Sequence, residues 1–187
     1  MGQLLLIILV VFIFTLIIGA YKSLNKLRSM SKDSWGRVQF NLNAKYELVS
    51  GFIEYLRSRE KSELVSDSIN QLIEARIKSI QAFSPFQKSL SEQSLDNTIK
   101  VVIENLDSIE YIAQDQRYIN LKTNLGNIDR DLMVSTNYYN AVVTDLNSRV
   151  QSFPSSLVAG MSGISSEELF RYDFFNNRQI LNNVRQN

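Results

Sequence analysis

The longest uninterrupted helical pattern of the sequence reads QRYINLKTNLGNIDRDLMVSTNYYNAVVTDLNSRVQ, residues 116–151. Its apolar side chains recur every three or four positions, which places them on one face of an α-helix. Phe153-Pro154 follows the pattern and ends it, because the residue before a proline avoids the helical region. The stretch therefore predicts a long amphipathic helix whose apolar face other segments must cover. These apolar residues are Ile119, Leu121, Leu125, Ile128, Leu132, Tyr139, Val142, Val143, Leu146 and Val150.

Three further helices are expected before this one. A first helix over 23–58 continues from an apolar N-terminal run without any proline to stop it. A second helix starts at a cap formed by Ser62 and ends at Ser84-Pro85. A third covers 92–113, and the polar residues 114–116 mark a break before the fourth. Short connections between amphipathic helices are typical of antiparallel packing.

The composition favours the same fold class. Only two prolines and seven glycines occur among 187 residues, and no run of useful length alternates polar and apolar positions. Few helix breakers and no period-two pattern disfavour β structure. We therefore predict an all-α protein: an antiparallel bundle of about four long helices, preceded by one N-terminal transmembrane helix.

Residues 4–21, LLLIILVVFIFTLIIGAY, are eighteen positions without a charge. As a helix they would be roughly 27 Å long, close to the hydrocarbon thickness of a bilayer, about 30 Å. A cleavable signal peptide is the alternative, but no basic residue precedes the run, the run is long, and no A-x-A pattern follows. We expect a retained anchor that contacts the lipid bilayer through residues 4–21.

The charges beside this run predict its orientation. Five basic residues and one acid lie within 22–37, whereas the other flank carries only the terminal amine. Basic flanks stay in the cytoplasm. We expect a single-pass protein of the cell (inner) membrane, with its N-terminus outside and its C-terminal domain cytoplasmic. The basic residues are Lys22, Lys26, Arg28, Lys32 and Arg37, and the acid is Asp33.

Two residue types are missing and exclude several chemistries. The sequence has no Cys and no His, which removes Cys/His zinc sites, thiol nucleophiles, Ser-His-Asp triads and Glu-x-x-His di-iron sites. The net charge of +1 disfavours nucleic-acid binding, which needs a surplus of basic residues. We expect no cofactor, no metal and no catalysis.

The remaining chemical candidates are carboxylates on the predicted helices. No spacing singles out two of them as an acid/base pair, so we expect solvated or ion-paired surface charges. Trp35, the only tryptophan, lies about 21 Å past the membrane end along a continuous helix, too far for an interfacial residue. It is therefore expected to anchor the bundle core near one end. The carboxylates are Glu54, Glu74, Glu104 and Glu110.

The C-terminal stretch differs from the rest. Gly160 and Gly163 are expected to loosen the chain, and four aromatic residues follow within 170–175. They could fold back onto the bundle or present anchors to a partner, and the Asn/Gln-rich end is expected to be disordered. The predicted division is 1–22 anchor, 23–160 bundle and 161–187 tail. The aromatic residues are Phe170, Tyr172, Phe174 and Phe175.

Several short motifs occur in a specific order along the chain. They are Trp35, Glu74-Ala75-Arg76, Tyr139-Asn140 and Phe153-Pro154, the last two within the block YNAVVTDLNSRVQSFPSSLVAG. In this order and spacing, residues 20–175 resemble the LemA family of small bacterial membrane proteins. The resemblance implies a helical bundle on one span with structural roles for these motif residues, and it supplies no established activity.

Two functions are compatible with these features. The first is a non-enzymatic, membrane-tethered scaffold or adaptor that binds an unknown protein partner at the membrane. The alternative is a homo-oligomer that self-assembles through the first and fourth helices and affects membrane organisation or envelope stress. An enzyme is the least favoured class.

Overall fold

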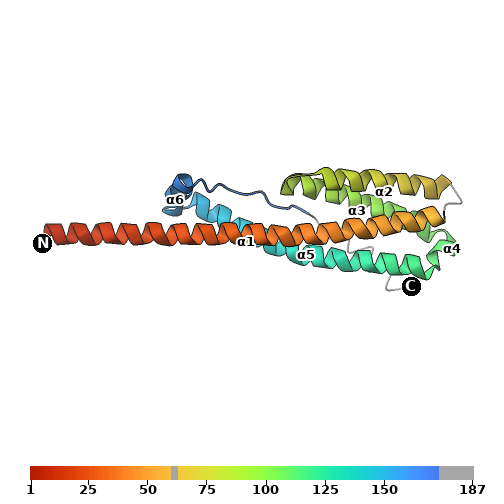
Figure 1. The fold of residues 1–187 in the computed structure, drawn as a ribbon, viewed down its shortest axis with the longest axis horizontal. Coiled ribbons are helices and arrows are strands. Elements are labelled where there is room, and N and C mark those ends of the chain that lie inside the picture. The colour runs from red at the N-terminus through yellow and green to blue at the C-terminus, as the bar shows by residue number, and fades with distance from the viewer. Residues whose placement is uncertain (60–62, 173–187) are drawn as a thin grey trace. The chain divides into compact units, whose positions relative to one another are not determined.

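The computed structural model describes residues 1–59 and 63–172. This part of the chain is helical and contains no strand (Figure 1). The predicted all-α class is therefore confirmed. The helices are α1 (Gly2–Ser58), α2 (Glu63–Gln81), α3 (Pro85–Asp107), α4 (Glu110–Ala113), α5 (Gln116–Gln151) and α6 (Ser155–Ser162).

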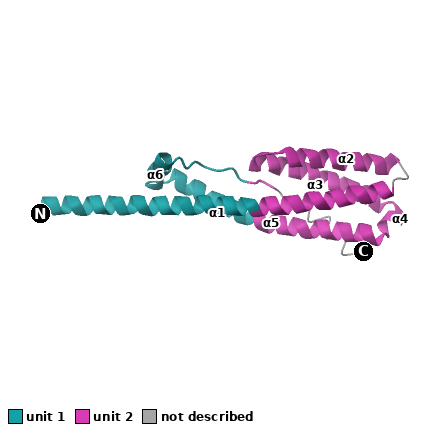
Figure 2. Ribbon diagram, viewed as in Figure 1, with its two compact units in different colours: residues 1–36, 137–169 teal, residues 37–136, 170–187 magenta. Residues whose placement is uncertain are grey.

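The chain divides into two compact units, shown in Figure 2. The anchor unit comprises residues 1–36 and 137–169, and the bundle unit comprises residues 37–136 and 170–187. Helices α1 and α5 each contribute to both units, because the unit boundaries fall within them. The two units are described separately below.

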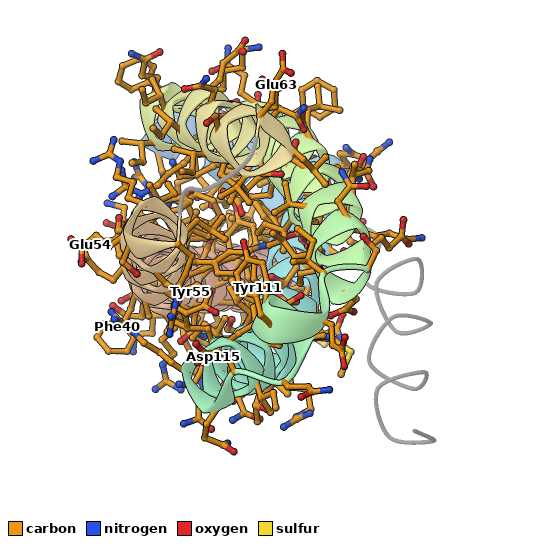
Figure 3. All side chains as sticks on the ribbon, turned by 90° about the vertical axis from the view of Figure 1, so that its right-hand side faces the viewer. Phe40, Glu54, Tyr55, Glu63, Tyr111 and Asp115 are labelled. Atoms are coloured by element: carbon orange, nitrogen blue, oxygen red, sulfur yellow. The ribbon has the colours of Figure 1, made fainter. Side chains whose placement is uncertain are left out.

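The bundle unit packs the C-terminal part of α1 with α2, α3 and the first part of α5, and successive long helices run antiparallel (Figure 1). Most of its core is apolar and includes an aromatic stack, in which the rings of Phe52 and Tyr118 have centroids 5.9 Å apart. Figure 3 shows Tyr55 directed inward, whereas Phe40 and Glu54 of the same helix point outward. This alternation is the amphipathic pattern read from the sequence. The large, fully buried side chains of this unit include Leu42, Leu56, Leu72, Leu95, Leu106 and Ile112.

The helix boundaries of α5 agree with the predicted range 116–151, but those of α3 do not. Ser84-Pro85 was expected to end the second helix, with the third starting at 92. Instead α2 ends at Gln81, and Ser84 caps α3 by accepting a hydrogen bond from the Gln87 amide at 3.3 Å. Serine before a proline in the first turn is a helix start signal, since proline needs no amide partner there. The predicted third helix to 113 is also interrupted, because α3 ends at Asp107 and α4 is separate.

The anchor unit contains the N-terminal part of α1, the end of α5, and α6. A small apolar core joins these three helices. Helix α6 was not predicted, because Gly160 and Gly163 were expected to loosen the chain. Gly160 lies inside α6, and Gly163 ends it with a left-handed φ of 61°, a conformation that glycine adopts without steric cost. The core residues are Leu24, Leu27, Val142, Leu146, Val158, Ala159 and Ile164.

Helix α1 runs unbroken from the apolar N-terminal run into the bundle, as expected. Every apolar residue from Leu4 to Ile18 is exposed. Among the described residues, α1 is the one helix long and apolar enough to cross a membrane. Trp35 of this helix is only partly buried, and its ring lies 5.1 Å from that of Tyr139 within the anchor unit.

Candidate functional site

A cluster of four charged residues lies in the interior of the bundle unit. We call Lys45, Glu92, Asp96 and Asp129 the charged cluster. Lys45 comes from α1, Glu92 and Asp96 from α3, and Asp129 from α5. Glu92 and Asp96 are four residues apart, which places both carboxylates on the same face of α3. A buried charge is costly unless it is paired, so the arrangement of these groups decides whether the bundle tolerates them.

The Lys45 ammonium is the centre of the cluster. Its Nζ forms an ion pair with Asp96 Oδ1 and lies 3.4 Å from Glu92 Oε2 and 3.6 Å from Asp129 Oδ1. Lys45 is 1% exposed and Glu92 is 0% exposed, whereas Asp129 is partly accessible at 23%. With all four groups ionised, three carboxylates face one ammonium, which gives the cluster a formal charge of −2.

Two aromatic residues of the C-terminal stretch, Phe170 and Tyr172, pack beside this cluster. The ring of Tyr172 lies 5.6 Å from Lys45 Nζ and stacks on Phe170 at 5.8 Å. Phe170 is buried, and Gln93 Nε2 donates to the Arg171 carbonyl at 3.1 Å. Of the two alternatives for these aromatic residues, folding back onto the bundle is the one observed for Phe170 and Tyr172. Phe174, Phe175 and the Asn/Gln-rich end lie outside the described residues.

A second layer of polar contacts surrounds the cluster. The Tyr46 hydroxyl donates to Glu92 Oε1. Lys88 Nζ donates to the carbonyls of Ser79 at 2.9 Å and Ala82 at 3.0 Å, which satisfies acceptors at the C-terminal end of α2. The Lys88 ammonium also lies 5.7 Å from the centre of the Tyr46 ring. These contacts join α1, α2 and α3 around the buried carboxylates.

The surroundings of the cluster shift the pKa values of its members. Burial alone would lower the pKa of Lys45, but the attraction of Asp96, Asp129 and Glu92 outweighs it and raises that pKa above its usual value. Burial raises the pKa of Asp96 to about 7, although Lys45 opposes the shift. Burial and the Glu92 carboxylate raise the pKa of Tyr46. Lys45 and Tyr46 therefore stay protonated at neutral pH.

These protonation states limit what the cluster can do chemically. An amine acts as a nucleophile or a base only in its neutral form, and Lys45 is held as an ammonium. The described residues include no group of three or more His, Cys, Asp or Glu side chains that could hold a metal ion. The ammonium itself lies between the three carboxylates, at the position that a cation would take. The geometry is that of a buried electrostatic clamp between helices.

Comparison with protein families matches residues 34–182 to the LemA family. The chain belongs to the LemA family. The match includes the charged cluster and the motifs quoted above, and it confirms the resemblance seen in the sequence. A comparison of the sequence with curated proteins finds no significant match. The LemA family is not known as a family of enzymes.

The Glu-Ala-Arg triplet of this LemA chain lies on α2, outside the charged cluster. Glu74 is exposed and pairs with Lys78 one turn later at 2.6 Å, and Ala75 is buried. Arg76 Nε donates to the backbone carbonyl of Tyr46 at 3.0 Å and so joins α2 to α1. Two of the three motif residues thus contribute to packing between helices.

The Tyr-Asn motif belongs to the anchor unit. The Tyr139 hydroxyl donates to the Glu168 carbonyl at 2.7 Å, and Asn140 is half-buried. Asn147 exchanges two hydrogen bonds of 2.8 Å with the backbone of Glu167. Tyr139 and Asn147 thus hold the segment that follows α6. Tyr139 also joins α5 to α1, because its ring packs on Trp35.

The other predicted site residues are not brought together with the charged cluster. Phe153 is 81% exposed, and the peptide bond between it and Pro154 is cis. The four candidate carboxylates on the predicted helices are all exposed, as expected: Glu54, Glu74, Glu104 and Glu110.

The charged cluster of this LemA chain was not predicted from the sequence, although the sequence contains a signal for it. Lys45 lies on the apolar stripe of α1, three residues after Leu42 and four before Val49. A charged residue in a stripe position must either snorkel to solvent or find a buried partner. Asp129 likewise lies between Leu125 and Leu132, at helical spacing from both. Three acids and one base on facing stripes predict a buried ion pair.

Proposed function

We propose that this LemA chain is a single-pass membrane protein whose helical bundle is a non-enzymatic scaffold or adaptor for a protein partner at the cytoplasmic face. The observation that carries the membrane assignment is the exposed apolar surface of α1 from Leu4 to Ile18. Soluble monomers rarely expose a contiguous apolar surface of this extent, whereas a bilayer covers it at no cost.

The basic residues after the span support a cytoplasmic bundle. Lys22 and Lys26 are exposed directly after the apolar run, and basic flanks remain inside. The absence of cysteine makes this testable with Ser94→Cys, at an exposed position of α3. A membrane-impermeant maleimide should label the variant only after cells are opened. Labelling in intact cells would overturn the orientation.

The partner-binding part of the proposal rests on an apolar patch on the hairpin between α2 and α3. This hairpin patch consists of five exposed apolar side chains, one in the three-residue link and two on each side of it. Phe83 in the link is 91% exposed. Exposed apolar surface of this kind is typical of protein interaction sites. The members are Ile77, Ile80, Phe83, Phe86 and Leu90.

Side-chain hydrogen bonds hold the backbone around the hairpin patch. Ser84 caps α3, and Lys88 donates to the last carbonyls of α2. A surface with a fixed backbone loses little conformational freedom when a partner binds, which increases its affinity. The patch is therefore better suited to binding than an equally apolar but frayed turn.

Site-specific photo-crosslinking in native membranes tests this function. A photo-reactive residue at position 83 should form an adduct with one partner protein, and the same group at Thr123 should not. Thr123 is exposed on α5 in the same unit and is the matched control. Adducts that are identical from both positions, or absent from position 83, would contradict the proposal. An adduct of two copies of the chain would favour the self-assembling alternative.

A further inference from the structure

We propose that α6 is a second membrane contact, which inserts Phe153, Leu157 and Met161 into the interface of the bilayer that α1 crosses. The inference rests on the proposed function, since it requires α1 to span the membrane. The surface that these three side chains contact is the lipid interface, at the level where acyl chains meet headgroups. It adds a second attachment to a protein otherwise tethered by one helix.

The first observation is an apolar surface on α6 that no described residue covers. Phe153, Leu157 and Met161 are 81%, 62% and 89% exposed. Leu157 and Met161 lie one turn apart on the same side of α6, and Phe153 precedes Leu157 by the same spacing. Val158 and Ala159 lie on another side of the helix and are buried. The helix is thus apolar on its packed side and on its exposed side.

The second observation is where α6 packs within the anchor unit. Val158 and Ala159 belong to the same core as Leu24 of α1, and Ala20 is packed against that core. The apolar run ends at Tyr21, so α6 lies beside the C-terminal end of the span (Figures 1 and 2). Leu24 is about 5 Å beyond Tyr21 along the helix axis. If α1 spans the membrane, α6 is at the height of the headgroups.

The third observation is the charge of this region. Residues 150–166 contain no charged side chain; Arg149, which pairs with Asp145, precedes them and Glu167 follows them. Lys22 and Lys26 are exposed on α1 at the same end of the span. An apolar helix that itself carries no acid, beside exposed basic residues of a membrane-spanning helix, has the composition that binds an anionic membrane interface. A bilayer is therefore a better fit than an acidic or basic protein surface.

Spin labels at single cysteines measure this contact directly, because the chain contains no native cysteine. The full-length protein is purified and reconstituted in phosphatidylethanolamine–phosphatidylglycerol bilayers. Labels are placed by Leu157→Cys and Met161→Cys on α6. Collisions with oxygen, which concentrates in lipid, are compared with collisions with a water-soluble nickel chelate.

Two further positions calibrate the measurement. Leu9→Cys lies in the middle of the apolar run and reports whether α1 is in lipid. Phe40→Cys replaces an apolar residue that is 74% exposed, similar to Phe153, but belongs to the bundle unit. We expect positions 157 and 161 to favour oxygen over the nickel chelate, at a shallower depth than position 9. Position 40 should favour the nickel chelate.

The outcomes separate the inference from the proposed function. If position 9 is in lipid while positions 157 and 161 are accessible to the nickel chelate, α6 is in water and the inference is wrong. The proposed membrane anchor α1 is then still supported. If positions 157 and 161 are inaccessible to both reagents, protein covers them, and the inference is again wrong. If position 9 is itself in water, the membrane anchor fails and the inference fails with it.

Discussion

Lys45 of α1 and Asp96 of α3 form an ion pair inside the bundle, and the two side chains are only 1% and 6% exposed. Removing two charges from water costs several kcal/mol for each ion, and their attraction offsets this only if the geometry is good. Glu92 and Asp129 also lie within 4 Å of the Lys45 ammonium, so one cation serves three carboxylates. Lys45 is therefore the residue on which the electrostatic balance of the bundle depends.

Lys45→Met should destabilise the protein strongly. It leaves three acidic groups in the interior without their cation, and breaking a buried pair in this way typically costs about 3–5 kcal/mol. Urea unfolding in detergent micelles, followed by circular dichroism, measures the loss. Lys78→Met is the matched control, because Lys78 forms an exposed pair with Glu74 and should have no measurable effect. Equal stability of the two variants would contradict the structural importance of the cluster.

The contribution of Asp96 to stability should fall as the pH rises from about 4 to about 7. Its pKa is about 7 in the folded protein, against an ordinary value of 3.8 for an aspartate in water, so the folded state binds more protons across this window. Stability then decreases with pH, by an amount on the order of a few kcal/mol. Lys45 does not contribute to the pH dependence of stability in this range, because its pKa is raised from an ordinary value of 10.5. Its contribution to stability is lost only at alkaline pH.

Asp96→Asn isolates this pH dependence. The variant lacks the titrating group, so the difference in unfolding free energy between wild type and variant should change between about pH 5 and about pH 8. Urea unfolding at the two pH values measures it, with Asp67→Asn, at an exposed position of α2, as the control. A difference that is constant with pH would contradict the raised pKa of Asp96.

Arg76 should contribute more to stability than Glu74, although both belong to one motif. Arg76→Ala removes the hydrogen bond to the Tyr46 carbonyl and should cost about 1–2 kcal/mol. Glu74→Ala removes only an exposed pair and should leave the urea midpoint unchanged. The reverse order of effects would indicate that the triplet has a role other than packing.

Two glycines of the α6 region should respond to alanine in opposite directions. Gly163→Ala forces a left-handed φ of 61° on a residue with a side chain and should cost about 1 kcal/mol. Gly160→Ala places alanine inside a helix where no other segment or neighbouring side chain lies within 4 Å of the new Cβ, and should stabilise by about 0.5–1 kcal/mol. The two urea midpoints should lie on opposite sides of the wild type. A loss in both variants would contradict the assigned ends of α6.

The sequence alone determined the all-α class, the apolar run and the limits of α5. These features are local, because helical periodicity, proline position and the absence of charge are set by residues within a few turns of one another. The motifs also indicated the LemA family, which the match over 34–182 then showed. The role of Ser84-Pro85 was misread because serine before proline both follows one helix and starts the next.

Only the tertiary structure decided the charged cluster and α6. Lys45 and Asp96 are 51 positions apart, and no local pattern tells which acid on another helix a buried lysine will meet. Helix α6 has eight residues, too few to show a helical period in the sequence. Only the tertiary structure shows that its apolar residues pack against Leu24. Periodicity tells which side of a helix is buried, whereas the partner on that side depends on how distant segments pack together.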